Sequence, residues 1–317
     1  MSIVVAVASA ASAMAETKIR VGHFPNVTHV QALVAHALSR QGRGWFEERL
    51  GGPTRTGVKI EWFVYNAGPS AMEAIFAKSI DLTYVGPSPA INAYSKSRGE
   101  EIRIVSGASN GGAALVAQPD SNLKTAADFR GKKIATPQLG NTQDVSCRAW
   151  LTAGGLKITQ LGGDAQVVPT QNADQLGLFK QKTIDAVWTV EPWVSRLEME
   201  AGGKVLVEET DSPTTVLVSS VKFLAANRET VKKFVEAHRA LTDWIQKNPT
   251  EAQKLVVEEL GAETQAKMAT ELIDHAWKRI VLTNDIPRDV LEKFVANAKA
   301  AGFLRDVPDL ARLIENL

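Results

Sequence analysis

The 317-residue sequence contains a single cysteine, Cys147, so no disulfide can form within the chain. It also lacks an excess of charge, because 36 Lys and Arg residues stand against 35 Asp and Glu residues. This balance, with no long run of one sign, argues against a nucleic-acid partner or an anionic membrane surface. With 44% hydrophobic and 22% charged residues and no low-complexity tract, the composition indicates an ordinary globular protein.

Several motifs for catalysis and metal binding are missing as well. The chain has no Gly-x-Ser-x-Gly elbow, no His-Glu-x-x-His zinc motif and no Walker phosphate loop. Its five histidines have no nearby Cys or carboxylate partner at metal-ligand spacing in the sequence: His23, His29, His36, His238 and His275. We therefore expect no structural metal and no cofactor.

The first segment is apolar but too short to span a membrane as a helix. Residues 3–15 end in Ala13-Met14-Ala15, the small-x-small pattern of a signal-peptidase site. No Lys or Arg precedes Lys18, so we expect the true reading frame to begin further upstream. The sequence predicts a signal peptide over residues 1–15 and export to the periplasm without a lipid anchor, since Cys147 lies far from the cleavage site. The alternative is a buried N-terminal segment.

From Lys18 onward, short apolar strands alternate with amphipathic helices, a pattern typical of an α/β fold with mainly parallel sheets flanked by helices. The chain is long enough for two lobes. We predict that residues 16–107 and 213–317 form lobe I and residues 108–212 form lobe II. Two crossings, near residues 108–112 and 210–215, would allow a hinge. The remainder from residue 221 is expected to be almost wholly helical and packed on lobe I.

Four turns lie where a predicted strand leads into a predicted helix, and none of them contains Lys or Arg. They span residues 24–29, 66–70, 85–89 and 138–144. The first N–H groups of a helix have no internal partner and lie at the positive end of its dipole, so they can bind an anion. Ligands of such sheets bind at the carboxyl ends of the strands, where all four turns are expected. The pattern predicts an oxyanion site of amides and hydroxyls without an ion pair, suited to reversible capture.

Several polar residues in these turns also have a purely structural explanation. Ser70 and Ser88 each follow a proline at a helix start, where a hydroxyl can cap the helix. Asn141 and Asp144 have capping-box spacing, which explains both and leaves residues 142–143 free to reach a ligand. Capping and ligand binding both remain open for the two serines.

Four further side chains have two readings each. His29 is either a ligand contact or a satisfied structural histidine. Trp188 and Trp193 flank Glu191 at the end of a predicted strand, where an aromatic face could clamp the tail of a ligand or form interlobe core. Glu191 could accept a hydrogen bond from a ligand amine or connect the two lobes, and we favour the second role.

Taken together, the motifs of the chain resemble those of the periplasmic solute-binding proteins of ABC importers, in the group that handles nitrate, bicarbonate, taurine and aliphatic sulfonates. The resemblance extends from Ile19 to about residue 245 and rests on five segments: residues 22–26, 79–89, 128–135, 137–144 and 184–193. It implies a two-lobed type II binding fold, a Venus flytrap, with the ligand held between the lobes. Carried onto this chain, the resemblance implies these ligand-binding residues: Pro25, Asn26, His29, Gly68, Ser70, Gly86, Ser88, Asn141, Thr142, Gln143, Trp188 and Glu191.

The resemblance implies a non-enzymatic, monomeric binding protein that delivers a small anion to an ABC permease in the inner membrane. Because the turns contain no basic residue, a sulfonate or a sulfate ester fits them better than nitrate or bicarbonate, which stay alternatives together with taurine. An enzyme on the same fold, such as a desulfinase or a thiamine-pyrimidine synthase, is the competing class. Cys147 would be its nucleophile, but the residue lies in the middle of a predicted helix among packing residues.

Overall fold

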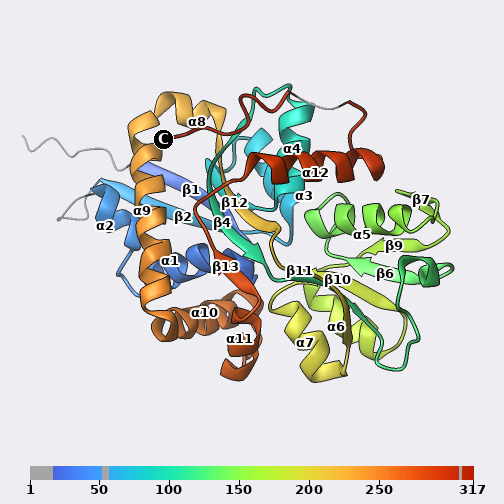
Figure 1. Cartoon of the computed structure of the whole chain (residues 1–317). Coiled ribbons are helices and arrows are strands. Elements are labelled where there is room, and N and C mark those ends of the chain that lie inside the picture. The colour runs from blue at the N-terminus through green and yellow to red at the C-terminus, as the bar shows by residue number, and fades with distance from the viewer. Residues whose placement is uncertain (1–16, 52–56, 307–308) are drawn as a thin grey trace, which may run out of the picture.

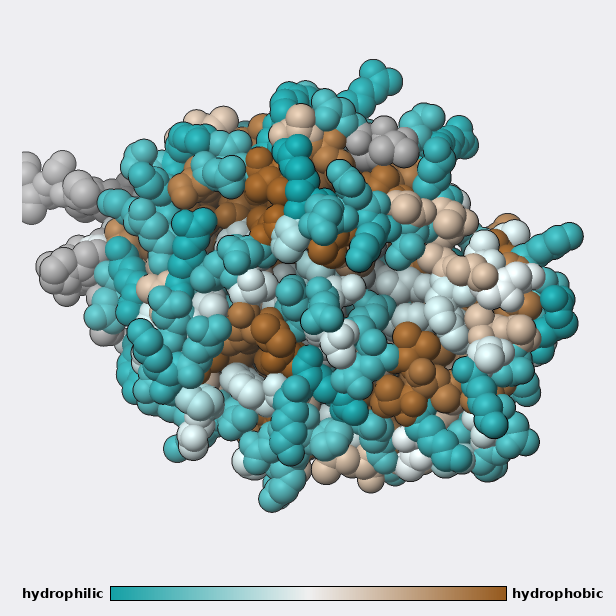
Figure 2. Space-filling model, viewed as in Figure 1, coloured by the Kyte–Doolittle hydropathy of each residue, from teal (hydrophilic) through white to brown (hydrophobic). Residues whose placement is uncertain are grey.

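The structure is a computed structural model that describes residues 17–51, 57–306 and 309–317. The predicted signal peptide over residues 1–15 lies outside the described residues. Within them, no helix combines the length and the apolar character needed to cross a bilayer. The face shown in Figure 2 is largely hydrophilic, with hydrophobic residues gathered in separate patches between hydrophilic ones.

Lobe I is built on a six-stranded sheet with the strand order β13-β4-β12-β3-β1-β2 (Figure 1). Strand β1 pairs in parallel with β2 and β3, whereas β12 is antiparallel to both β3 and β4. Side chains alternate between the two faces, so Leu217 joins one hydrophobic cluster while Val216 and Val218 join the other. The strands are β1 (Thr17–His23), β2 (Val58–Val64), β3 (Leu82–Val85), β4 (Ile102–Gly111), β12 (Pro213–Ser220) and β13 (Ile280–Leu282).

Lobe II contains a five-stranded sheet with the order β11-β5-β10-β6-β9. Strand β6 pairs in parallel with β9 and β10, and β5 is antiparallel to β10 and β11. The strands are β5 (Ala113–Ala117), β6 (Lys133–Thr136), β9 (Gln166–Pro169), β10 (Ala186–Val190) and β11 (Lys204–Glu209), and a separate pair is formed by β7 (Ile158–Thr159) and β8 (Gly162–Gly163).

The two sheets are mixed rather than uniformly parallel. The strands that follow the predicted alternation, such as β1, β2 and β3, run in one direction, as expected. Strands β5 and β12 run against their neighbours because each begins just after the chain has crossed from the other lobe. At the first crossing, Gly111 and Gly112 adopt φ of 73° and 75°, which glycine reaches without the strain that a side chain would add.

Helices cover the sheets and begin at the carboxyl ends of the strands. Helices α3 and α4 each carry proline in their first turn, where the missing N–H removes no internal hydrogen bond. In lobe I these elements are η1 (Val27–His29), α1 (Val30–Arg40), α2 (Trp45–Gly51), α3 (Gly68–Phe76) and α4 (Pro87–Lys96). In lobe II they are η2 (Ala126–Phe129), α5 (Thr142–Ala153), α6 (Asn172–Lys180) and α7 (Trp193–Ala201).

The C-terminal part differs from the prediction in two ways. It contains strand β13, which extends the sheet of lobe I along β4, so it is not wholly helical. It also does not pack on lobe I alone, because α12 lies across the interlobe boundary against α4 and α5, and α11 contacts α7 (Figure 1). The helices are α8 (Val221–Ala226), α9 (Arg228–Lys247), α10 (Pro249–Thr264), α11 (Thr270–Trp277) and α12 (Arg288–Ala300). The apolar face of α12, which includes the buried residues Leu291 and Phe294, favours this placement.

Candidate ligand-binding site

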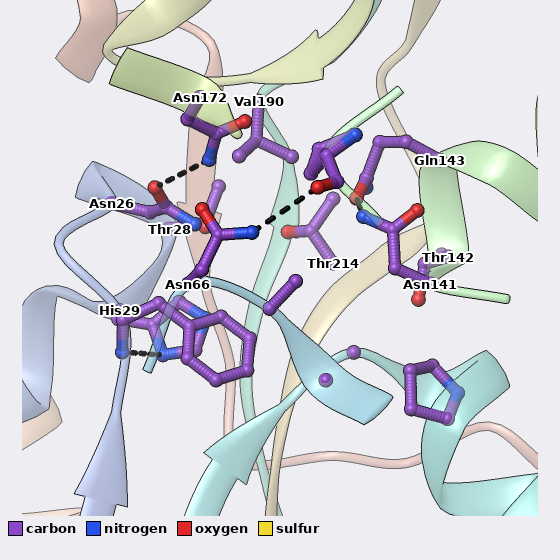
Figure 3. Close-up of a pocket in the computed structure, with 16 residues that line it drawn as sticks. Asn26, Thr28, His29, Asn66, Asn141, Thr142, Gln143, Asn172, Val190 and Thr214 are labelled. Carbon is purple, nitrogen blue, oxygen red and sulfur yellow. Dashed lines mark hydrogen bonds between the residues drawn. The ribbon is translucent and has the colours of Figure 1, made fainter. Parts of the chain in front are cut away.

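A cavity lies between the lobes, where the strands of both sheets end. In this closed arrangement its free volume is only about 20 Å³, so the lobes must separate for a ligand to enter. Lobe I contributes Phe24, Asn26, Thr28, His29, Asn66, Ala67, Gly68, Gly86, Pro89 and Thr214, and lobe II contributes Pro137, Asn141, Thr142, Gln143, Asn172 and Val190 (Figure 3).

Five helices begin at this cavity: η1, α3, α4, α5 and α6. The N-terminus of α5 is capped within the protein, because the Asn141 side chain accepts a hydrogen bond from the Asp144 amide at 2.8 Å. No side chain caps α3, α4 or α6 among the described residues. In these three first turns, Pro69, Pro87 and Pro89 have no N–H, and the Asp174 amide donates to the Gln171 carbonyl at 3.0 Å. The other first-turn amides can bind a guest, and the helix dipoles favour a negative one.

The cavity wall is uncharged. None of the described residues that line it is Lys, Arg, Asp or Glu. Burial lowers the pKa of His29 well below its ordinary value, and the neighbouring His23 lowers it further, so the ring is neutral at neutral pH. Its Nδ1 accepts a hydrogen bond from the Phe24 amide at 3.4 Å, which leaves the proton on Nε2. Neutral donors in a dry cleft can hold an anion without a counter-charge.

The hydroxyl of Thr142 has no partner although it is buried. Its Oγ1 is among the buried polar atoms without a hydrogen bond in the described part of the chain. The residue approaches Gly86 of the other lobe so closely that a Cβ built on Gly86 would lie 2.2 Å from Thr142 Oγ1. A buried hydroxyl without a partner is costly, and a ligand oxygen would relieve that cost.

Asn26 connects the two lobes beside the cavity. Its Oδ1 accepts a hydrogen bond from Asn172 Nδ2 at 3.3 Å (Figure 3). The same oxygen accepts a second bond from Trp193 Nε1 at 2.8 Å. The amide of Val27 donates to the carbonyl of Glu191 at 2.9 Å. These contacts fix the first turn of lobe I against lobe II and hold Asn172 in place.

A second set of contacts closes the other side of the cavity. Asn66 Nδ2 donates to the Pro137 carbonyl at 3.1 Å, and Ser70 Oγ lies 3.0 Å from Gln138 Nε2. Each of these bonds joins lobe I to lobe II. The lobes therefore meet around the cavity, as in the closed form of a hinged binding protein.

The structure brings seven of the twelve predicted residues into the cavity wall: Asn26, His29, Gly68, Gly86, Asn141, Thr142 and Gln143. The five others lie outside it: Pro25, Ser70, Ser88, Trp188 and Glu191. Ser70 bonds to Gln138 of the other lobe. Ser88 Oγ is buried without a partner, near the cavity but not in its wall.

Trp188 and Glu191 are bound within the protein. Trp188 packs edge-on against Trp150 in the core of lobe II, and its Nε1 donates to Glu209 at 3.0 Å. The Glu191 carboxylate accepts from the amide and hydroxyl of Ser195 and from Arg279 Nη1, at 3.0, 2.9 and 3.0 Å. Arg279 lies between α11 and β13, so this ion pair joins the lobes, which is the role that we favoured for Glu191.

Sequence reasoning missed Thr28, Asn66, Asn172 and Thr214 among the polar wall residues. Asn66 belongs to the second predicted turn, and Asn172 stands at the start of a predicted helix. Both therefore lie at a helix start, the feature by which the other site residues were selected. Thr214 had no such signal, because it reaches the cavity from the second crossing between the lobes. Its Oγ1 lies 3.2 Å from Ser109 Oγ on the first crossing strand.

The spacing of the histidines along the sequence, from which we expected no metal, did not reveal partners that the fold brings together. His23, His36 and Glu263 offer ligand atoms that all lie within 4.8 Å of one another. The spacing within the sequence could not show this, because His23 and Glu263 are 240 residues apart. Cys147 is buried in lobe II, and burial, with the nearby Asp144, raises the pKa of its thiol well above the usual range.

Comparisons with solved structures support the same architecture. The alkanesulfonate-binding protein SsuA from Xanthomonas axonopodis pv. citri, bound to MOPS, has a TM-score of 0.76 at 20% identity, over 96% of this chain and all of that one. The periplasmic nitrate-binding protein NrtA from Synechocystis PCC 6803 has a TM-score of 0.72 at 14% identity, over 92% of this chain and 83% of that one. At these identities the likeness shows the fold alone, a two-lobed type II periplasmic binding fold.

Sequence comparisons support the same relationship as the structural ones. A Bacillus subtilis (strain 168) protein named "Putative aliphatic sulfonates-binding protein" is 26% identical over 233 residues, which is 71% of this chain and 67% of that protein. The NMT1-like family matches residues 12–260, well over half of the chain. The resemblance found in the sequence motifs is thereby confirmed, and the chain belongs to the NMT1-like family.

Proposed function

We propose that this protein is the periplasmic solute-binding component of an ABC importer and that it captures a small organic anion with a sulfonate or sulfate-ester head group. The observation that carries the proposal is the cavity between the lobes, where the uncapped starts of α3, α4 and α6 meet an uncharged wall. Ligand contacts from both lobes would favour the closed form, which the membrane permease would recognise.

The chemistry of the wall supports a sulfonate over the alternatives. A tetrahedral head group with three oxygens can accept from several amides and from the Thr142 hydroxyl at once, while Phe24 and Val190 offer apolar contact to a short tail. Taurine would need a carboxylate for its ammonium group. Glu191 cannot supply it from its present position, because its carboxylate is held by Ser195 and Arg279 outside the cavity.

A ligand panel tests the proposal directly. Isothermal titration calorimetry of the purified mature protein would compare ethanesulfonate, methyl sulfate, taurine, nitrate and bicarbonate. We expect ethanesulfonate or methyl sulfate to bind at least about tenfold more tightly than nitrate, because their tails can contact Phe24 and Val190 and nitrate has no tail. Binding of nitrate or bicarbonate alone would contradict the proposed substrate class.

The affinity is expected to change little between about pH 6 and pH 8, because His29 is the titratable group of the wall and its ring stays neutral there. A histidine with a lowered pKa stabilises the folded state fully above its unfolded value of about 6.5 and loses that contribution as the pH falls. Titrations with the same anion at several pH values measure the affinity across this range. A loss of affinity above pH 7 would show that a protonated group holds the anion.

Replacing Cys147 by alanine is expected to leave ligand affinity unchanged. The thiol is buried in lobe II with a raised pKa and does not line the cavity. The lost sulfur contacts should lower stability by about 1–2 kcal/mol. If the wild-type protein converted its ligand, as followed by mass spectrometry of the mixture, and the variant did not, the chain would be an enzyme that uses this cysteine.

A further inference from the structure

The buried cluster behind the first wall turn has the donor set of a metal site. His23 ends β1, His36 lies on α1, and Glu263 lies in the last turn of α10. Glu263 Oε1 lies 2.5 Å from His23 Nε2 and 3.0 Å from His36 Nδ1. Glu259, one turn earlier on α10, places its Oε1 2.8 Å from the same His36 nitrogen. We propose that these residues bind one Zn²⁺ ion, with His23, His36 and Glu263 as ligands.

The cluster leaves a ligand atom free. Glu263 Oε2 is buried and has no hydrogen-bond partner within the described residues, whereas the unpartnered His23 Nδ1 lies on the opposite side of the ring from the Nε2 atom that would bind the ion. The side chains of His23 and Glu263 are completely inaccessible to bulk solvent. Buried polar atoms normally have partners, and a cation would supply one here.

The distances fit a tetrahedral ion after a small adjustment. Zinc binds histidine nitrogen and carboxylate oxygen at about 2.0–2.2 Å, so two ligand atoms of a tetrahedral site lie about 3.4 Å apart. The two nitrogen–oxygen distances to Glu263 are shorter than this by less than about 1 Å. Side-chain rotation can make that change, and zinc accepts such mixed nitrogen and oxygen donors more readily than magnesium or calcium does.

Charge and packing support the same ion. Metal binding requires neutral imidazoles, and in that state the carboxylates of Glu259 and Glu263 outweigh Arg40, whose Nε lies 2.9 Å from Glu259 Oε1. The metal-binding form of the cluster therefore attracts a divalent cation. Trp62 stacks on the ring of His36 at 5.3 Å and meets His23 edge-on at 5.4 Å, so both ligands are held in orientation.

The position of the cluster links it to the ligand cavity without making it part of that site. His23 directly precedes Phe24, which lines the cavity, whereas the metal ligands themselves do not. A bound ion would add a direct link between β1, α1 and α10. Entry is open from the side of His36, whose side chain is 11% exposed.

Equilibrium dialysis of tag-free, chelator-treated protein against ZnCl₂, followed by metal analysis, tests the proposal. We expect about one zinc per chain, a higher melting temperature with zinc, and no binding of magnesium or calcium in its place. His36→Gln and Glu263→Gln should each weaken zinc binding by at least about 100-fold. His275→Gln is the matched control, because this partly exposed histidine lies outside the cluster, and it should retain the zinc.

A second readout does not depend on the variants. With CoCl₂ in place of zinc, the wild-type protein should develop the strong visible absorption of tetrahedral cobalt, and zinc should abolish it. Absence of zinc binding, retention of zinc by both variants, or an octahedral cobalt spectrum would each overturn the proposal. Ligand titrations are unaffected by these results, so a failure here and a failure of the proposed importer function are distinguishable.

Discussion

Gly86→Ala is expected to lower affinity for the tightest-binding anion by about 100-fold or more. The new methyl group would lie 2.2 Å from Thr142 Oγ1 and 3.2 Å from Thr142 Cβ, across the boundary between the lobes. Such an overlap costs about 1–3 kcal/mol even when neighbours move, and here it also displaces a predicted ligand donor. Gly86 has φ −68° and ψ 152°, which alanine adopts freely, so lobe I should fold normally. Calorimetric titration measures the loss.

Three further variants distinguish an effect on lobe closure from a general effect of the substitution. Gly177→Ala is the control, because a Cβ at this helical position meets nothing within 4 Å, and its affinity should equal that of the wild type. Thr142→Ala alone should cost about 10- to 100-fold through the lost hydroxyl. The double variant Gly86→Ala/Thr142→Ala should lose less than the sum of the two, since removal of Oγ1 makes room for the methyl group. Wild-type affinity for Gly86→Ala would refute the closed arrangement of the cavity.

Arg279→Met is expected to lower the free energy of unfolding by about 3 kcal/mol. Arg279 of lobe I bonds to three carboxylates of lobe II, those of Glu191, Glu198 and Glu208. Glu191 is fully buried, so the variant leaves its charge without a cationic partner. Burial raises the pKa of Glu191, and the bonds from Ser195 and Arg279 oppose that rise. Urea denaturation at pH 7 measures the change.

The pH dependence of this deficit identifies its cause. Without Arg279 the folded-state pKa of Glu191 rises further, and a carboxyl group with a raised pKa stabilises the fold at low pH and loses that contribution as the pH increases through the raised value. The deficit should therefore be smaller at about pH 5 than at pH 8. Lys182→Met, which breaks the exposed pair with Asp120, should cost little at both values because solvent screens the pair. Equal losses for both variants would contradict the role of Arg279.

The fold was largely predictable because its signals are local. The alternation of apolar strands and helices, with a turn after each strand, placed β1, α1, α5 and β6 where the structure has them. The exceptions depend on distant contacts. The short strand β13 forms only because β4 offers a free edge, and α12 leaves lobe I because its hydrophobic face also meets α5.

The site was predictable to the extent that helix starts define it. Gly86, Asn141 and Thr142 stand at helix starts, the positions that predict an anion site, and all three line the cavity. Trp188 was selected for its place at the end of a strand, yet the sequence cannot show which way an indole points. The contact between His23 and Glu263 joins β1 to α10 through packing that no local pattern encodes.

A crystal structure of the protein with the tightest-binding anion of the panel tests the central claim most directly. The account predicts a negatively charged head group between the lobes, within hydrogen-bond distance of Thr142 Oγ1 and of first-turn amides from both lobes. It predicts no Lys or Arg side chain in contact with that group. An anion bound outside the interlobe cavity, or held there by a basic side chain, would contradict it.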